Sequence, residues 1–307
     1  MTKLLVVGSV NMDIVTHVTK LPVPGETVKG LSTDYFPGGK GANQAVAASM
    51  AGAEVTFAGA VGEDAYGPRL IESLQSKGVR TENILRKPTG SGIAYINVDN
   101  SGENHIILSE GANGQFSADD LLRGSRCFEG VQGLLLQNEI PWETTVQALK
   151  LARSHGVFTC YNPAPVAPVP SEVWPLIDLV VVNESEAEQL TGIHVEQPDS
   201  YKQAVEALLA QGAQSVLLTL GEKGCIFADR QGKEVKQSAF RVKAVDTTAA
   251  GDTFIGSFMA AYLSGQALED SLQFASAASA IAVSRAGAQA SIPSREEIEA
   301  FLQAQHL

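Results

Sequence analysis

DTTAAGDTF, residues 246–254, is the most informative stretch of this 307-residue chain. Its small residues would let backbone N–H groups approach an anion, and the amphipathic helix predicted to begin there would add the positive end of its dipole. The carboxylate of Asp252 would repel that anion. The contradiction disappears if Asp252 acts on a hydroxyl group that attacks the anion. The stretch therefore predicts a phosphoryl-transfer site.

The composition narrows the class of protein. A formal net charge of −12 argues against a nucleic-acid-binding protein, because no basic patch is visible. A hydrophobic content of 44% and 29 glycines fit a globular enzyme with many tight loops. An acidic protein that binds a nucleotide would have to do so locally, with backbone N–H groups, a few cations and a metal ion.

Cysteine content and hydrophobic runs predict a cytoplasmic location. Cys127, Cys160 and Cys225 are widely spaced and fit reduced thiols, without the spacing of a metal site. The N-terminal apolar segment fits a strand and is too short for a signal peptide. No apolar run approaches the length of a membrane span.

Strands alternate with helices along most of the chain, which predicts a mostly parallel sheet covered on both faces. Segments 13–36 and 90–109 do not fit this sheet, and we expect them to form a small separate β-sheet that covers the site as a lid on a single domain, 1–307. Strands are predicted at 4–7, 55–60, 134–137, 158–161, 179–182 and 215–219, a hairpin at 225–240, and helices at 41–50, 64–77, 143–154, 184–190, 201–210, 251–264 and 268–284.

A second glycine-rich segment, PGGKGANQ at 37–44, precedes a helix of small residues. Asn43 and Gln44 would lie in its first turn, where polar side chains can face a ligand. A solvated lysine in an ordinary glycine-rich loop is the alternative explanation. The segment is not a Walker A loop, since GxxxxGK[ST] is absent, and no strand leads into GxGxxG, so a Rossmann dinucleotide site lacks its motif.

Polar side chains also follow predicted strands, where ligands bind in open α/β sheets. Asn11 and Asp13 follow the first strand and would suit vicinal hydroxyl groups, although both residues also favour turns. Asn183 and Glu186 follow the strand at 179–182. They could cap a helix or orient metal-bound water or phosphate. The turn at 219–224 is a weak nucleotide signal by itself. The five histidines share no metal-binding spacing.

Together these motifs resemble the ribokinase family of carbohydrate kinases, also called the PfkB family. Two signatures carry the resemblance, GGKGAN at 38–43 and the 246–254 stretch. Further matches extend over the whole chain in order: GSVNMD at 8–13, PGET at 24–27, NPAP at 162–165, NESE at 183–186, TLG at 219–221 and GAQ at 287–289.

The resemblance implies a three-layer αβα core with a β-sheet lid, and ATP-dependent phosphorylation of D-ribose at O5. It implies that Asp252 is the catalytic base and that Ala249, Ala250 and Gly251 form the anion hole. The residues implied to hold the sugar are Asn11, Met12, Asp13, Gly39, Lys40, Gly41, Ala42, Asn43, Glu139 and Asp252.

The resemblance also implies a nucleotide site and two cations. A monovalent cation, usually potassium, would lie beside the anion hole, and Mg²⁺ would accompany ATP, with Glu186 acting on it through water. Residues implied to hold ATP are Asn183, Thr219, Leu220, Gly221, Glu222, Lys223, Gly224, Gly251, Asp252 and Ser276; those implied to hold potassium are Asp246, Thr248, Ala282, Arg285, Gly287 and Ser291.

One residue departs from the family pattern. Relatives often carry His or Asn where this chain has Ser276, and serine cannot stack on adenine. The alternatives are a kinase of 2-deoxyribose, fructose, a fructose phosphate or adenosine, and a non-catalytic sugar or nucleotide sensor. The intact Asp252 argues against a sensor. The resemblance further implies a homodimer formed through the lid.

Overall fold

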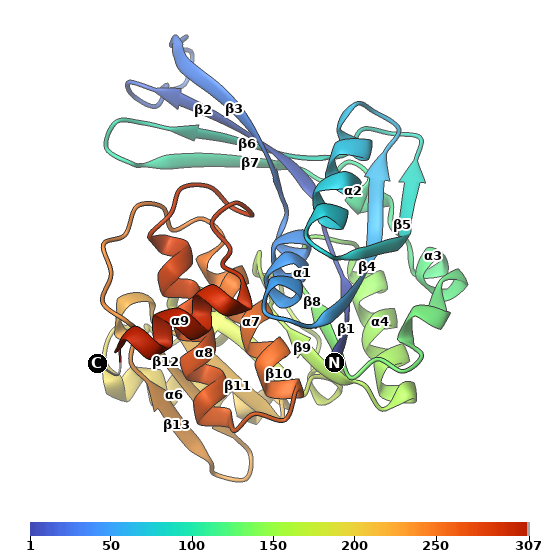
Figure 1. The fold of residues 1–307 in the computed structure, drawn as a ribbon, viewed down its shortest axis with the longest axis vertical. Helices are drawn as coiled ribbons and strands as arrows, with labels where there is room; N and C mark the ends of the chain where they lie inside the picture. Colours follow the sequence, from blue (N-terminus) through green and yellow to red (C-terminus); the bar gives the residue numbers. More distant parts are fainter. Residues whose placement is uncertain (306–307) are drawn as a thin grey trace.

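The computed structural model describes residues 1–305 and contains two β-sheets, one of nine strands and one of four. The nine-stranded sheet lies within the body of the molecule, and the four-stranded sheet projects beyond it (Figure 1). The predicted α/β architecture with a separate small sheet is therefore confirmed.

The large sheet has the order β13-β12-β11-β10-β9-β8-β1-β4-β5. Its strands run parallel except for β12, which is antiparallel to both neighbours. The strand bounds are β1 Lys3–Val7, β4 Glu54–Gly62, β5 Arg80–Lys87, β8 Gly133–Leu136, β9 Phe158–Tyr161, β10 Leu179–Asn183, β11 Ser215–Thr219, β12 Cys225–Asp229 and β13 Glu234–Gln237.

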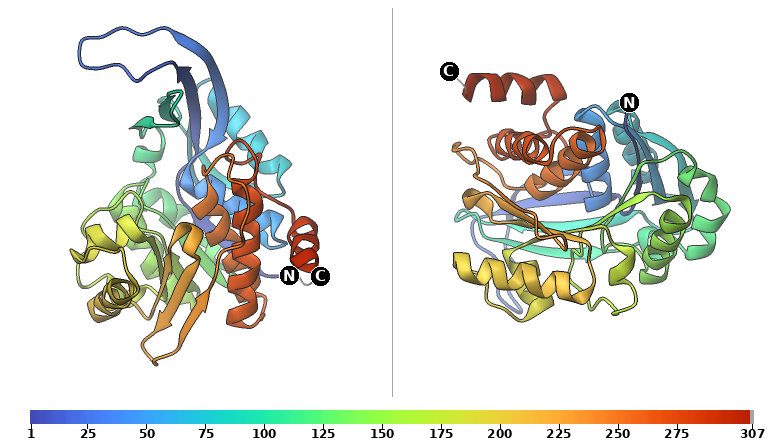
Figure 2. Two further views of the ribbon diagram at one scale, coloured as in Figure 1. Left: turned by 90° about the vertical axis from the view of Figure 1, so that its left-hand side faces the viewer. Right: turned by 90° about the horizontal axis from the view of Figure 1, so that it is seen from below.

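Helices cover both faces of this sheet, and the alternation of strand side chains explains why (Figure 2). In β1, Leu4 and Val6 belong to one apolar core, whereas Leu5 and Val7 belong to the other. The first core is closed by α1 (Lys40–Met50), α2 (Tyr66–Ser76), α7 (Ala250–Leu263), α8 (Leu268–Val283) and α9 (Arg295–Gln305), and the second by α3 (Ala118–Arg123), α4 (Trp142–His155), α5 (Glu184–Thr191) and α6 (Pro198–Gln211).

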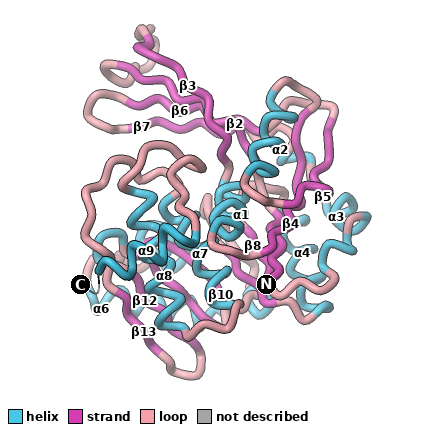
Figure 3. Tube along the Cα trace, in the orientation of Figure 1, coloured by secondary structure: helices cyan, strands magenta, loops and turns pink. Residues whose placement is uncertain are grey.

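The small sheet has the order β3-β2-β6-β7 and comes from two separate segments of the chain. The first segment, 11–38, extends two residues beyond the predicted 13–36 at each end, and the second, 92–109, lies within the predicted 90–109. The strand pairs β2–β3 and β6–β7 are antiparallel, and β2 joins them by pairing parallel to β6 (Figure 3). The bounds are β2 Asn11–Val18, β3 Gly30–Gly38, β6 Gly92–Val98 and β7 Asn104–Ser109.

One strand and two α-helices were not predicted. Strand β5 is a half-buried edge strand of mixed polarity, so it has no apolar run to reveal it. Helix α3 has only six residues. Helix α9 did carry a signal, a capping box in which Ser294 and Glu297 exchange hydrogen bonds between side chain and backbone. Among the described residues, no helix is both long and apolar enough to cross a membrane.

The topology determines which loops meet. Chain order runs outward from β1 in both directions, toward β4 on one side and β8 on the other. Ligand sites in open α/β sheets form outside the carboxyl ends of strands at such a switch point. The segments that leave β1, β8, β9 and β10 at their carboxyl ends therefore lie along one edge of the sheet.

Candidate active site

Asp252 lies buried in the first turn of α7, where two amide side chains hold its carboxylate. Asn43 Nδ2 donates to Oδ2 at 3.1 Å, and Gln44 Nε2 donates to Oδ1 at 3.0 Å. Both amides come from the first turn of α1. The two helices approach closely because Gly256 faces α1, where any Cβ would overlap the Gln44 carbonyl.

Charged side chains from strand β2, from the start of α1 and from the loop after β8 lie near Asp252. Burial, followed by repulsion from Glu139 and Asp252, raises the pKa of Asp13 to about 7. Glu139 accepts hydrogen bonds from the Ser9 hydroxyl at 2.5 Å and from the Lys40 backbone N–H at 3.1 Å. Burial raises the pKa of Glu139 despite these bonds. The site therefore concentrates carboxyl groups that are poorly solvated.

Lys40 is the cation of this cluster. Burial acts to lower the pKa of its ammonium group, but the surrounding carboxylates, led by Asp252 and Glu139, raise it more, so the net shift is upward. Lys40 therefore remains protonated and partly neutralises the carboxylates.

Asn11 occupies the start of β2 with its side chain tied in place. Its Oδ1 accepts a hydrogen bond from Asn113 Nδ2 at 2.7 Å. Asn113 also bonds the backbone of Val10 through both its oxygen and its nitrogen. This orientation of the two amides leaves the Asn11 Nδ2 group available as a donor. Asn113 was not predicted, because an asparagine in a loop carries no distinctive sequence signal.

The turn before α7 has an unusual backbone. Ala249 has φ 59°, and it is the only non-glycine residue with positive φ among those the structure describes. The left-handed conformation is strained for a residue with a Cβ. The Ala250 N–H already donates to the Thr247 carbonyl at 3.2 Å, so an anion would have to compete for it. Gly251 is exposed.

Asp246 joins two of the segments predicted to hold potassium. Its Oδ1 accepts from the Thr248 N–H and its Oδ2 from the Gly287 N–H, each at 2.9 Å. Arg285 points away and pairs with Glu297 at 2.6 Å, which leaves only its backbone for a cation. The remaining predicted potassium ligands, Ala282 and Ser291, are buried at the two ends of the 282–291 segment. Within residues 1–305 no three His, Cys, Asp or Glu side chains cluster as a metal site.

The segment at 183–186 forms the predicted helix cap. Asn183 Oδ1 accepts from the Glu186 N–H at 2.8 Å, and Glu186 Oε2 accepts from the Asn183 N–H at 3.0 Å. This capping box explains the sequence pattern structurally, while burial raises the pKa of Glu186. The Glu186 carboxylate also accepts from Asn162 Nδ2 at 3.4 Å, which directs it toward the Asp252 side of the sheet edge.

The predicted nucleotide turn, 219–224, connects β11 to β12 through a 3₁₀ turn at Gly221–Lys223. Lys223 Nζ bonds Tyr201 Oη at 2.8 Å and Glu184 Oε1 at 3.0 Å, so its side chain is directed toward α5 and α6. Ser276 is buried in α8 and lies against the Cys225 thiol. The turn and Ser276 thus lie on neighbouring elements.

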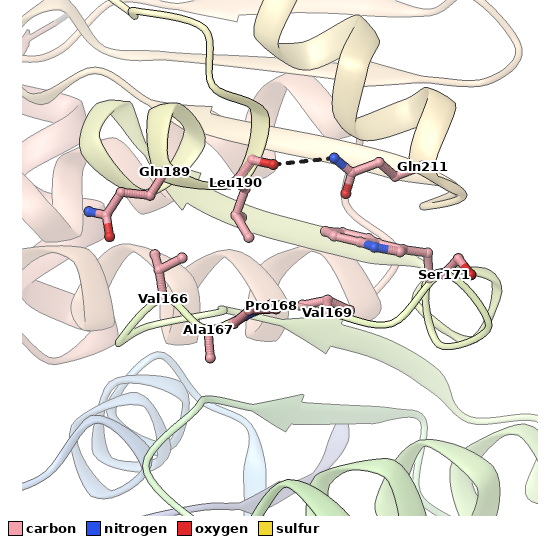
Figure 4. A pocket seen from close by; sticks show the side chains of 9 residues that line it. Val166, Ala167, Pro168, Val169, Ser171, Gln189, Leu190 and Gln211 are labelled. Atoms are coloured by element: carbon pink, nitrogen blue, oxygen red, sulfur yellow. Dashed lines mark hydrogen bonds between the residues drawn. The ribbon is translucent and has the colours of Figure 1, made fainter.

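A cavity of about 660 Å³ lies elsewhere, between the loop that follows β9 and helices α5 and α6. Gln211 Nε2 closes one side by donating to the Leu190 carbonyl at 3.4 Å (Figure 4). None of the predicted site residues lines it. The cavity is therefore separate from the site predicted at the edge of the sheet.

Residues 1–295 match the profile described as pfkB family carbohydrate kinase. The chain belongs to this family. It is a kinase. Phosphoryl transfer is consistent with the position of Asp252 just after the strained backbone of Ala249.

The sequences of known relatives align with this kinase over almost its whole length. A ribokinase of Haemophilus influenzae is 39% identical over 301 residues, which are 98% of each chain. A deoxyribokinase of Salmonella typhimurium is 36% identical over 299 residues, 97% of each chain. The two specificities therefore lie at similar distances from this kinase.

Solved structures agree in fold. The crystal structure of a ribokinase from Thermotoga maritima is 38% identical, with a TM-score of 0.89 over 99% of this kinase and 100% of that chain. An Arabidopsis thaliana ribokinase, solved as a complex with ribose and ATP, is 34% identical, with a TM-score of 0.91 over 99% of each chain.

Proposed function

We propose that this kinase transfers the γ-phosphoryl group of ATP to O5 of D-ribose, giving D-ribose 5-phosphate and ADP. The observation that carries the proposal is the position of the Asp252 carboxylate. It lies in the helix turn that follows Ala249 and beside the polar cluster of Asp13, Lys40 and Glu139. An attacking hydroxyl held by that cluster would meet an anion held by the turn.

Asp252 acts as the base. A primary hydroxyl is far too weak an acid for a carboxylate to deprotonate before reaction, but a loose phosphoryl-transfer transition state does not require this. Asp252 orients O5 toward phosphorus and accepts the proton late. The amides of Asn43 and Gln44 occupy one acceptor position on each of its oxygens. Acceptor positions remain for the sugar hydroxyl.

The turn at 249–251 receives the transferring group. Backbone N–H donors aimed at developing charge commonly contribute about 3 kcal/mol each. The left-handed backbone of Ala249 supports this role, because such strain persists where the surrounding structure imposes it. The Ala250 N–H must exchange its turn hydrogen bond for the phosphoryl oxygen.

The sugar lies against the start of β2 and the loop after β8. Asn11 donates from its free Nδ2 group, and Asp13 and Glu139 accept from sugar hydroxyls. Lys40 donates through its ammonium group. A free pentose matches this mixture of acceptors and donors.

ATP lies along Asn183, the 219–224 turn and Ser276, with its phosphates toward Gly251. Mg²⁺ bound with ATP would neutralise the charge that develops on the phosphates during transfer. The buried Glu186 carboxylate fits this ion, because it is an oxygen donor that could accept from metal-bound water. Potassium would order the turn through Asp246 and carbonyl groups of the 282–291 segment.

The four-stranded sheet acts as the lid of a single domain and excludes water when it closes. Its strands expose apolar side chains, and Leu31 and Ile107 are 62% and 65% exposed. We propose that a second copy of this chain covers them in a cytoplasmic homodimer. Sedimentation analysis tests this, and a monomer at micromolar concentration contradicts it.

A kinase of 2-deoxyribose is the second candidate, supported by the similarity to a deoxyribokinase. A coupled assay of ADP release separates the candidates with D-ribose, 2-deoxyribose, fructose, fructose 6-phosphate and adenosine. The highest kcat/KM is expected with D-ribose. A higher value with any other acceptor reassigns the substrate, and no turnover with any of them favours a sensor.

A further inference from the structure

Gln44 is fully buried near the start of α1 and contacts three polar side chains from three other segments of the chain. Its Nε2 donates to Asp252 Oδ1 at 3.0 Å and to Asn162 Oδ1 at 3.4 Å. Its Oε1 accepts from Gln137 Nε2 at 2.6 Å. All the polar atoms of this side chain are thus engaged inside the protein.

The hydrogen bonds of this network have one possible direction. An ionised carboxylate only accepts, so the NH₂ group of Gln44 must face Asp252. The Gln44 oxygen must then face Gln137 and accept a hydrogen bond from its NH₂ group. No rotation of the Gln44 amide keeps both contacts.

The far end of the network gives the same direction. Asn162 accepts from Gln44 through its oxygen, which leaves its NH₂ group for the Val181 carbonyl at 3.0 Å and Glu186 Oε2 at 3.4 Å. Both of these partners are acceptors. The two carboxylates at the ends of the network therefore fix the orientation of the Gln44 and Asn162 amides between them.

The side chain of Gln137 packs closely against Gly8, in the loop that follows β1. A Cβ at Gly8 would overlap the Gln137 side-chain oxygen, so the glycine provides the space that this side chain occupies. Gln137 is itself completely buried. The amide that reaches Asp252 is therefore supported by a second buried amide rather than by solvent.

We infer that Gln44 is a positioning residue for the catalytic carboxylate. This inference rests on the proposed role of Asp252 as the base. Asn43 holds one carboxylate oxygen and Gln44 the other, so together they fix the plane of the carboxylate. Gln44 does not itself take part in bond making or proton transfer. It keeps an acceptor position of Asp252 aligned with the attacking hydroxyl, which matters because misalignment of reacting groups is costly to rate.

The test begins with Gln44→Met, which keeps the length of the side chain and removes the donor. A hydrogen bond to a charged group is strong enough that kcat is expected to fall about tenfold to a hundredfold. The KM for ribose is expected to stay within about threefold of its original value, since the lost contact is not to the sugar. A kcat within about twofold of the parent overturns the inference.

Gln75→Met is the matched control. Gln75 bonds Thr81 at the start of β5, by the amino end of that strand and so away from the catalytic edge. The same chemical change there is expected to leave kcat and KM unaltered.

A repeat in the Asp252→Asn background separates positioning from general structural support. If Gln44 acts through the carboxylate, the double variant is expected to have the same kcat as Asp252→Asn alone. An equal fractional loss in both backgrounds shows that Gln44 supports the fold or another group, and overturns the inference.

Two further variants keep the test decisive if Gln44→Met does not fold, which thermal denaturation reveals. Gln44→Glu keeps the size and cannot donate when ionised, so it is expected to lower kcat at least as much. Gln137→Met leaves Gln44 in place but removes the donor that fixes its amide, so a smaller loss is expected. Unchanged kcat in both overturns the inference. Failure of the proposed function is distinguishable, because it appears already as absence of ribose turnover in the parent protein.

Discussion

The Asn43 side chain donates a hydrogen bond to the Asp252 carboxylate at 3.1 Å across 209 positions of sequence. It joins the first turn of α1 to the first turn of α7 and thereby links two glycine-rich segments. The contact requires the close approach of the two helices at Gly256. The sugar-side segment and the anion turn are therefore joined directly.

Replacing Asp252 by Asn is expected to lower kcat at least about a hundredfold, because the amide cannot accept the proton from the attacking hydroxyl. Binding of ribose and ATP, measured by calorimetry, is expected to persist, since the amide keeps the size of the carboxylate. Near-normal turnover would remove Asp252 from the role of base.

Asp13→Asn is expected to stabilise the substrate-free protein, and more so at pH 8 than at pH 5. The pKa of Asp13 is raised from 3.8 to about 7 by burial and then by Glu139 and Asp252. The folded state therefore binds more protons than the unfolded state between about pH 4 and 7, and the free energy of unfolding falls as the pH rises through this window. Asparagine does not titrate and avoids that loss.

Thermal denaturation at the two pH values provides the measurement. Asp34→Asn, on an exposed position of β3, serves as the control for the general effect of removing a negative charge. Equal shifts in melting temperature at pH 5 and pH 8 would contradict a raised pKa at Asp13. The variant is also expected to raise the KM for ribose.

Ala249 is expected to respond oppositely to two substitutions. Glycine relieves the strain of a left-handed backbone, worth about 1 kcal/mol, so Ala249→Gly is expected to retain or raise the melting temperature. Valine is β-branched and strongly disfavoured at positive φ, so Ala249→Val is expected to destabilise the protein and lower kcat. Stability equal to the parent in the valine variant would show that the turn relaxes freely.

Potassium is expected to increase turnover. The cation would order the turn held by Asp246, so kcat measured in potassium chloride should exceed that in the chloride of a large organic cation at equal ionic strength. Asp246→Asn is expected to reduce the difference, because it weakens the bonds to Thr248 and Gly287. Equal rates in the two salts would exclude this activation.

Particular residues show how far the sequence could be interpreted. The strands β9 and β11 were predicted with their observed bounds, since each is a short apolar run between polar turns. The edge strand β5 was missed because it is only half-buried, and its sequence has neither an apolar run nor a regular alternation of apolar and polar residues. Helix α9 was missed although its capping box could have revealed it.

Some residues of the candidate site could be proposed from the sequence and others could not. Asp13, Lys40 and Asp252 could be proposed from local motifs, through the types of residue and their spacing. Asn113 and Gln137 were not, because an isolated buried amide has no local pattern that distinguishes it from a solvated one. Their importance lies in long-range hydrogen bonds.

By itself the sequence determined the family, the mostly parallel sheet with a smaller second sheet, and the segments proposed to carry the chemistry, because these depend on periodicity and on local glycine-rich motifs. Only the tertiary structure decided how those segments meet. The order of strands around β1 brings four loops to one edge. Burial at that edge raises the pKa of Asp13, and the Gln44 amide faces Asp252 there. Such effects depend on distance and desolvation in three dimensions, which no local stretch of sequence contains.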